Sequence, residues 1–126
     1  MLVVIIIIGI LAALALPQFN KSKEYAIGKE AIANLKLIAA AEKIYRMEAN
    51  AYFPIPSGSN SSITDINSYL RLSIPSGTSK NWDYSVTGAA GSFSSEAQRT
   101  SGSYSDCQYS IDQSQDEPVV ASGTCP

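Results

Sequence analysis

The first twenty residues of the chain carry no charged side chain, and most of them are aliphatic. At about 1.5 Å per residue, a helix over these residues is about 30 Å long, which matches the hydrocarbon thickness of a bilayer. A helix at the surface of a soluble domain shows a polar face within two turns, whereas this segment shows none. The segment therefore requires lipid or an apolar environment made by other copies of the chain.

From Leu2 to Phe19 the sequence is LVVIIIIGILAALALPQF. This run resembles the N-terminal helix that type IV pilins share with the pseudopilins of type II secretion. Five positions make the likeness more specific than apolar character alone: Gly9, Ala12, Ala13, Pro17 and Phe19.

The family's usual opening is not present. In that family a short basic leader ends in glycine, and the mature chain opens Phe-Thr-Leu-Ile-Glu. Here Met1 stands at about the place of the leucine that follows that glutamate. Leader processing, N-terminal methylation and charge pairing by the glutamate are therefore not carried over to this sequence.

The resemblance implies an α+β fold, in which a long N-terminal helix packs by its C-terminal half against a small antiparallel β-sheet headpiece. It implies a structural subunit that polymerises into an extracellular type IV pilus and stays in the inner membrane before assembly. The expected partners are other copies of the chain, the inner membrane and the pilus assembly machinery. The residues expected to pack the filament core are Leu2, Val3, Val4, Ile5, Ile6, Ile7, Ile8, Gly9, Ile10, Leu11, Ala12, Ala13, Leu14 and Leu16.

Other functions stay open at this point. One is the major pseudopilin of a type II secretion system, another is a monomeric membrane-anchored surface domain that binds a ligand, and a third is an adhesive or DNA-receptor protein at a filament tip. The apolar segment by itself also fits a single-span anchor. A cleaved secretory signal fits less well, because such signals place a basic region before the apolar run and none precedes it here.

The composition argues against catalysis and cofactors. The chain of 126 residues has no histidine and two cysteines, so it lacks the commonest general base and cannot form a four-thiolate zinc site. Its net charge is −2, so the composition does not indicate the excess of basic residues that is typical of a protein whose primary partner is nucleic acid. We therefore expect no enzyme activity, no cofactor and no resident metal.

Two points in the apolar helix are expected to break or stretch in a filament. Pro17 has no N–H to donate to the carbonyl of Ala13, and Gly9 costs about 1 kcal/mol relative to alanine in a helix. In lipid the backbone bonds should be kept, because the bilayer offers no other partners. The hypothesis is a helix that is continuous in the membrane and loosened near residues 12–16 in the polymer.

Residues 21–52 continue the helix as an amphipathic segment, to about Ala51, and the prolines of Phe53-Pro54-Ile55-Pro56 then stop it. One apolar stripe of this segment can pack against the headpiece, and it consists of Ile27, Ala31, Leu35, Ile38, Ala41, Tyr45, Ala49 and Tyr52. A second stripe consists of Ala33, Leu37, Ala40, Ile44 and Met47. This second stripe indicates either a surface for neighbouring helices or a helix sunk more deeply in its own domain.

Residues 53–126 form a serine-rich headpiece. Ser57 to Ser62 are predicted as a loop, and Ser62-x-x-Asp65 resembles a capping box that starts a short helix. Alternation predicts a strand over Trp82 to Val86, a turn over Gly88–Gly91 and a weaker strand over Ser92–Arg99. A last hairpin is expected from residues 108–112 and 117–121. Three or four strands on the Tyr45 stripe would then bury Trp82, Tyr84 and Phe93.

Cys107 and Cys125 are expected to form a disulfide if the headpiece is exported, and are free thiols if it stays in a reducing compartment. Many type IV pilins, which the chain resembles, close a C-terminal segment in this way. By the chain-entropy estimate such a loop contributes about 3 kcal/mol.

Three further groups of residues have both a functional and a purely structural interpretation. The weak calcium candidates Asp112, Asp116 and Glu117 match no EF-hand spacing and are more typical of solvated turn acids. The aromatic residues Tyr25, Tyr45, Tyr52, Phe53 and Tyr69 suit a core better than electron transfer. Exposed glycosylation would use Ser57, Ser59, Ser61 or Ser62, or the weak sequon at Asn60.

Overall fold

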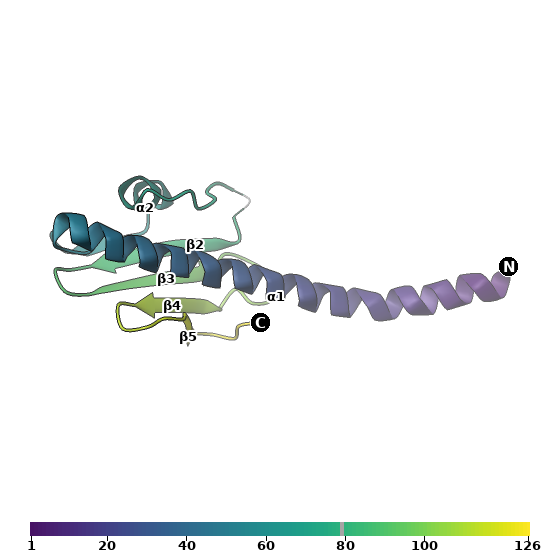
Figure 1. Ribbon diagram of the computed structural model, residues 1–126. Coiled ribbons are helices and arrows are strands. Elements are labelled where there is room, and N and C mark those ends of the chain that lie inside the picture. The colour runs from purple at the N-terminus through teal and green to yellow at the C-terminus, as the bar shows by residue number, and fades with distance from the viewer. Residues whose placement is uncertain (79) are drawn as a thin grey trace.

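The computed structural model describes residues 1–78 and 80–126. Two helices and five strands follow one another along the chain (Figure 1). Their bounds are α1 Leu2–Ala49, β1 Gly58–Asn60, α2 Ile63–Leu70, β2 Trp82–Gly88, β3 Phe93–Arg99, β4 Gln108–Asp112 and β5 Val119–Ser122. The predicted α+β fold, with a long N-terminal helix packed on a small antiparallel sheet, is confirmed.

Helix α1 runs unbroken for 48 residues, through both Gly9 and Pro17. Neither residue interrupts it in the single chain, although the helix bends in its N-terminal third (Figure 1). The helix ends two residues before the predicted Ala51. Asn50 adopts the left-handed conformation (φ 57°) and donates its N–H to the carbonyl of Arg46, so the helix stops at this cap before the prolines are reached.

The five strands form one sheet in the order β1-β2-β3-β4-β5, and every neighbouring pair is antiparallel. The prediction of three or four strands was therefore too low. The additional strand is β1, which lies in the segment predicted as a loop. Its three residues, Gly-Ser-Asn, carry no apolar side chain and follow no alternating pattern, so the strand exists because its backbone pairs with the edge of β2.

The connection from α1 to β1 crosses the end of β2. A Cβ at Gly88 would lie 2.0 Å from the carbonyl oxygen of Phe53, so no larger residue fits where the two backbones meet. Tyr52 also donates its N–H to the carbonyl of Ala89, at 3.0 Å. These contacts fix the course of the chain directly after the long helix.

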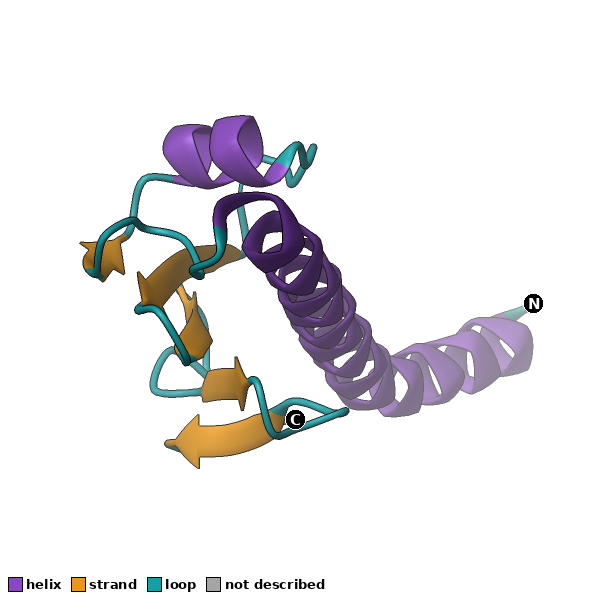
Figure 2. Cartoon of the chain, turned by 60° about the vertical axis from the view of Figure 1, so that its left-hand side comes forward, coloured by secondary structure: helices purple, strands orange, loops and turns teal. Residues whose placement is uncertain are grey.

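The hydrophobic core lies between the sheet and the C-terminal half of α1, and α2 contacts both α1 and β2 (Figure 2). Along β2 and β3 buried and less buried side chains alternate, as a sheet with one covered face requires. Leu35 and Ile38 of the first stripe are fully buried. Trp82, Tyr84 and Phe93 are buried against them, as predicted.

Candidate assembly surface

The N-terminal part of α1 has no covering partner within the chain. Every residue from 1 to 23 is exposed, and this includes all the residues predicted to pack a filament core. An 18-residue window of the helix reaches a mean hydropathy of 2.7 with none of it buried, so it meets the length and composition of a membrane-spanning helix. An apolar surface of this size requires lipid or another protein chain.

The headpiece is anchored to α1 from Glu24 onward. The Arg99 guanidinium lies 3.3 Å from a Glu24 carboxylate oxygen, and it also donates to the carbonyl of Asn81 at 2.9 Å. The indole Nε1 of Trp82 donates to the carbonyl of Ile27 at 2.9 Å. These contacts hold the end of the sheet nearest the N-terminus and leave the preceding helix free.

A second anchor lies one to two turns further along α1. The Asn34 side-chain amide donates to the Tyr84 hydroxyl at 2.8 Å, and Asn81 donates to Glu30 at 2.9 Å. Burial raises the pKa of Tyr84 to about 12, with a smaller opposing effect of the Asn34 hydrogen bond. The hydroxyl therefore stays protonated and neutral in the core at neutral pH.

The third anchor is a buried carboxyl group. Glu42 is fully buried, and its Oε2 accepts a hydrogen bond from the backbone N–H of Phe53 at 2.9 Å. Its Oε1 has no hydrogen-bond partner among the residues that the structure describes. Burial raises the pKa of Glu42 to about 7, and the Phe53 hydrogen bond only partly offsets this.

Four of the five aromatic residues singled out in the sequence form ring contacts around the same connection. Phe53 stacks on Tyr69 with ring centroids 4.9 Å apart and meets Tyr45 edge-on at 6.0 Å. Tyr52 pairs with Phe93, whereas Tyr25 lies apart on α1 under Lys29. Core packing therefore accounts for Tyr45, Tyr52 and Phe53, whereas Tyr69 stacks on Phe53 from an exposed position.

The second stripe of α1 points away from the headpiece core. Leu37, Ile44 and Met47 are 47%, 55% and 77% exposed, and Ala33 and Ala40 are exposed as well. The alternative of a helix sunk more deeply in its own domain is therefore wrong for these side chains. An apolar stripe thus continues along α1 beyond the uncharged segment.

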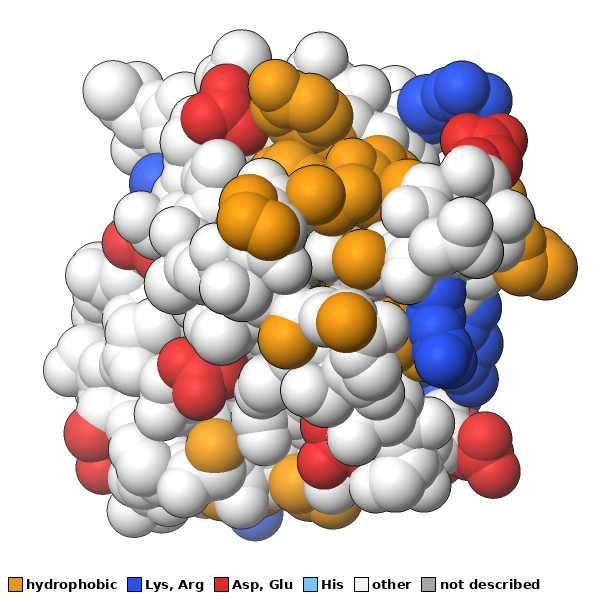
Figure 3. Space-filling view, turned by 90° about the vertical axis from the view of Figure 1, so that its left-hand side faces the viewer, with side chains coloured by type: hydrophobic (Ala, Val, Ile, Leu, Met, Phe, Trp, Pro, Cys, Tyr) orange, Lys and Arg blue, Asp and Glu red, His pale blue; other side chains and the backbone are white. Residues whose placement is uncertain are grey.

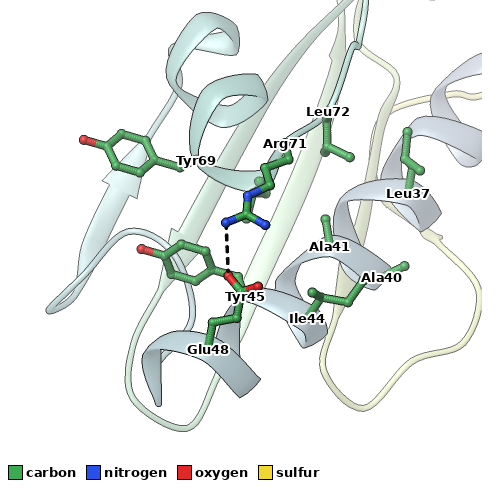
Figure 4. Close-up of a pocket in the computed structure, with 10 residues that line it drawn as sticks. Leu37, Ala40, Ala41, Ile44, Tyr45, Glu48, Tyr69, Arg71 and Leu72 are labelled. Carbon is green, nitrogen blue, oxygen red and sulfur yellow. Dashed lines mark ion pairs between the residues drawn. The ribbon is translucent and has the colours of Figure 1, made fainter.

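Beside this stripe lies a groove of about 250 Å³, which we call the α1–α2 groove. Leu37, Ala40 and Ile44 line it from α1, and Tyr69, Arg71 and Leu72 line it from α2 and the residues after it (Figure 4). Arg71 forms an ion pair with Glu48 across one end, at 3.6 Å. Hydrophobic side chains also gather on the face of the headpiece remote from the N-terminus (Figure 3).

The three weak calcium candidates do not converge. Asp112 accepts hydrogen bonds from the hydroxyl and the N–H of Ser114, which lower its pKa, and Glu117 forms an ion pair with Lys36. Within residues 1–78 and 80–126 there is no group of three metal-ligating side chains. Cys107 and Cys125 form a disulfide that closes the C-terminal segment containing β4 and β5.

The segment proposed for glycosylation serves to cap α2. The Ser62 hydroxyl accepts from the N–H of Asp65 at 3.3 Å, which is the predicted half of the capping box. In place of the other half, the side-chain Oδ1 of Asn60 accepts from the N–H of Ser62, and the side-chain Nδ2 of Asn60 donates to Asp65. The Asn60 side chain is therefore engaged, whereas Ser57, Ser59 and Ser61 are exposed.

Glu24, Glu42 and Arg99 were not singled out in the sequence, although two of them carried a signal. Glu42 follows Leu35 by seven residues and Ile38 by four, which places it on the first stripe. Arg99 is an even number of residues from Phe93 and Ala97 along the same strand, so the alternation of side chains places it on the buried face with them. Glu24 carried no such signal, and its ion pair with Arg99 is seen only in the folded chain.

No protein-family model and no curated protein matches this chain.

Proposed function

We propose that the chain is the structural subunit of a helical filament of the type IV pilus kind, with the N-terminal part of α1 forming the filament core. The single observation that carries the proposal is the exposed, uncharged segment that extends free of an otherwise well-anchored headpiece. Parallel copies of such a helix bury one another's apolar side chains and leave the headpieces outside. The resemblance of residues 2–19 to pilins supports the same function.

The second stripe favours a polymer over a monomeric membrane anchor. Ala33 lies 14 residues beyond Phe19, which is about 21 Å along the helix. A bilayer that covers residues 2–19 does not reach this height, so lipid does not account for the exposed Leu37, Ile44 and Met47. Neighbouring helices account for them.

The unbroken helix suits a membrane stage before assembly. Each backbone carbonyl and N–H within the segment is served by the helix itself, apart from those freed at the N-terminus and at Pro17. The proposed route is therefore insertion in the inner membrane, extraction by the assembly machinery and incorporation into an extracellular filament.

Electron microscopy of surface appendages tests the proposal. The appendages are sheared from cells that express the whole chain and are identified by mass spectrometry. We expect Ile7→Asp to abolish the filaments, because a charge buried without a partner is strongly unfavourable. Val119→Asp, at an exposed position in the headpiece, should leave them at normal yield.

Two results would contradict the proposal. One is filaments of normal yield from the Ile7→Asp variant, and the other is wild-type protein that remains monomeric in the membrane. Short periplasmic filaments that require secretion components would instead identify the pseudopilin.

A further inference from the structure

We propose that the α1–α2 groove receives the apolar helix, residues 2–16, of a second copy of the chain, and that this contact sets the axial position of one subunit relative to another. The inference rests on the proposed function and deepens it. It assigns one wall of an intersubunit binding site to the end of α2 and the residues directly after it.

The groove has the character of an interface. Its floor is apolar, from Leu37, Ala40 and Ile44, and its rim holds Tyr69 together with the Arg71–Glu48 ion pair. Tyrosine and arginine around an apolar centre are typical of protein contacts that contribute strongly to binding. Because Arg71 is already paired with Glu48, an uncharged occupant leaves no charge without a partner.

The volume of the groove limits what enters it. A space of about 250 Å³ takes one or two large side chains and not a whole backbone. Side chains three or four residues apart on a helix form a ridge that fits such a groove. In this chain residues 2–16 form the longest exposed helical surface with large apolar side chains at these spacings and no charge.

The occupant has to come from another copy. Ile44 follows Leu16 by 28 residues and Leu2 by 42 residues, so it lies about 42–63 Å from that segment along its own helix. A parallel second copy shifted along the axis by a distance in this range brings its apolar segment level with the groove. The proposal therefore fixes an axial offset as well as a contact.

Disulfide cross-linking in assembled filaments tests the contact. Ile44→Cys is combined in one chain with Ile7→Cys, Leu11→Cys or Leu14→Cys, while Cys107 and Cys125 remain paired with each other. We expect a ladder of cross-linked multimers on non-reducing gels for at least one of the three combinations. Filaments without any ladder would overturn the proposal, as would a ladder only when Ile44→Cys is combined with Val120→Cys, which would place the exposed valines of β5 in the groove.

A groove-filling variant tests the same contact without cysteine. Ala40 is exposed and lines the groove, so Ala40→Phe occupies it from within and leaves the headpiece core untouched. We expect filament yield to fall at least tenfold, while circular dichroism of the detergent-solubilised protein is unchanged. Ala90→Phe, at an exposed position between β2 and β3 and outside both the groove and the second stripe, is the matched control and should keep its filaments.

The outcomes separate this inference from the proposed function. If the wild-type chain forms no filaments, the proposed function fails. If it forms them and Ala40→Phe assembles with normal yield and helical rise, or if Ala90→Phe loses as much, only the assignment of the groove is overturned.

Discussion

At the residue scale, Glu42 links the end of the long helix to the connection that follows it. A fully buried carboxylate is strongly disfavoured unless it is neutral or paired, and Glu42 has one hydrogen bond from Phe53 and one oxygen without a partner. Its raised pKa, about 7, means that the folded chain keeps a proton which the unfolded chain releases at lower pH. The stability of the headpiece is therefore linked to pH through this side chain.

The sign of that linkage gives a prediction. Between an unfolded-state pKa of 4.5 and a folded-state pKa of about 7, the folded state binds more protons, so the free energy of unfolding falls as the pH rises. The contribution of Glu42 is complete below pH 4.5 and is lost through about pH 7, and the loss is on the order of 3 kcal/mol. Urea unfolding of the detergent-solubilised chain, followed by circular dichroism from pH 4.5 to 8, measures it.

Glu42→Gln should flatten this dependence, because the amide stays neutral and its oxygen still accepts from Phe53. The control is Glu48→Gln, on the same helix but largely exposed, which should keep the wild-type slope. A Glu42→Gln variant whose stability falls with pH as steeply as that of the wild type would show that another group is responsible.

At the scale of elements, the parts with a strong repeating pattern were predictable and the others were not. The 3.6-residue stripe of α1 and the alternation Trp82-Tyr84-Val86 each follow from one buried face. β1 and the true end of α1 were not predictable, since the first depends on backbone pairing with β2 and the second on the conformation of Asn50. Among the anchors, the meeting of Glu24 with Arg99 joins residues 75 apart, which no local pattern encodes.

The C-terminal element makes a prediction of its own. β5 has four exposed residues and lies at the sheet edge, where its pairing with β4 and the nearby Cys107–Cys125 bond hold it. We expect Cys107→Ser with Cys125→Ser to lower the free energy of unfolding by about 3 kcal/mol. Hydrogen exchange should rise over residues 108–124 more than elsewhere in the headpiece.

Mass spectrometry of the unreduced protein provides the accompanying check, since the bond should yield a single cross-linked C-terminal peptide. Alkylation of both thiols without reductant, or uniform exchange across the sheet in the double variant, would refute this account.

At the scale of the whole molecule, the free helix and the anchored headpiece meet different environments in the two proposed states. In lipid the helix has to satisfy its own backbone, and the structure shows it unbroken through Pro17. In a filament, neighbouring chains offer other partners, and the turn before Pro17 already lacks one hydrogen bond. We therefore predict that residues 12–16 are where the helix would loosen on the proposed assembly.

A filament map at side-chain resolution checks this prediction, and it should show a stretched backbone near residues 12–16. Pro17→Ala restores the missing N–H, so filaments of this variant should be less extensible and differ in rise. Unbroken helix from Ile5 to Lys21 in the wild-type map would remove the hypothesis, and so would identical rise and extensibility in the variant.

Trp82 has a spectroscopic consequence, because it is the only tryptophan in the chain. Its buried indole donates to the backbone of Ile27 and lies under the Arg99 guanidinium, at the join between sheet and helix. Its fluorescence emission therefore reports whether the headpiece stays seated on α1, and a shift to longer wavelength marks water entering that join. Since residues 1–23 contain no tryptophan, the proposed insertion and polymerisation of the free helix can be followed against this native optical reference without attaching a label.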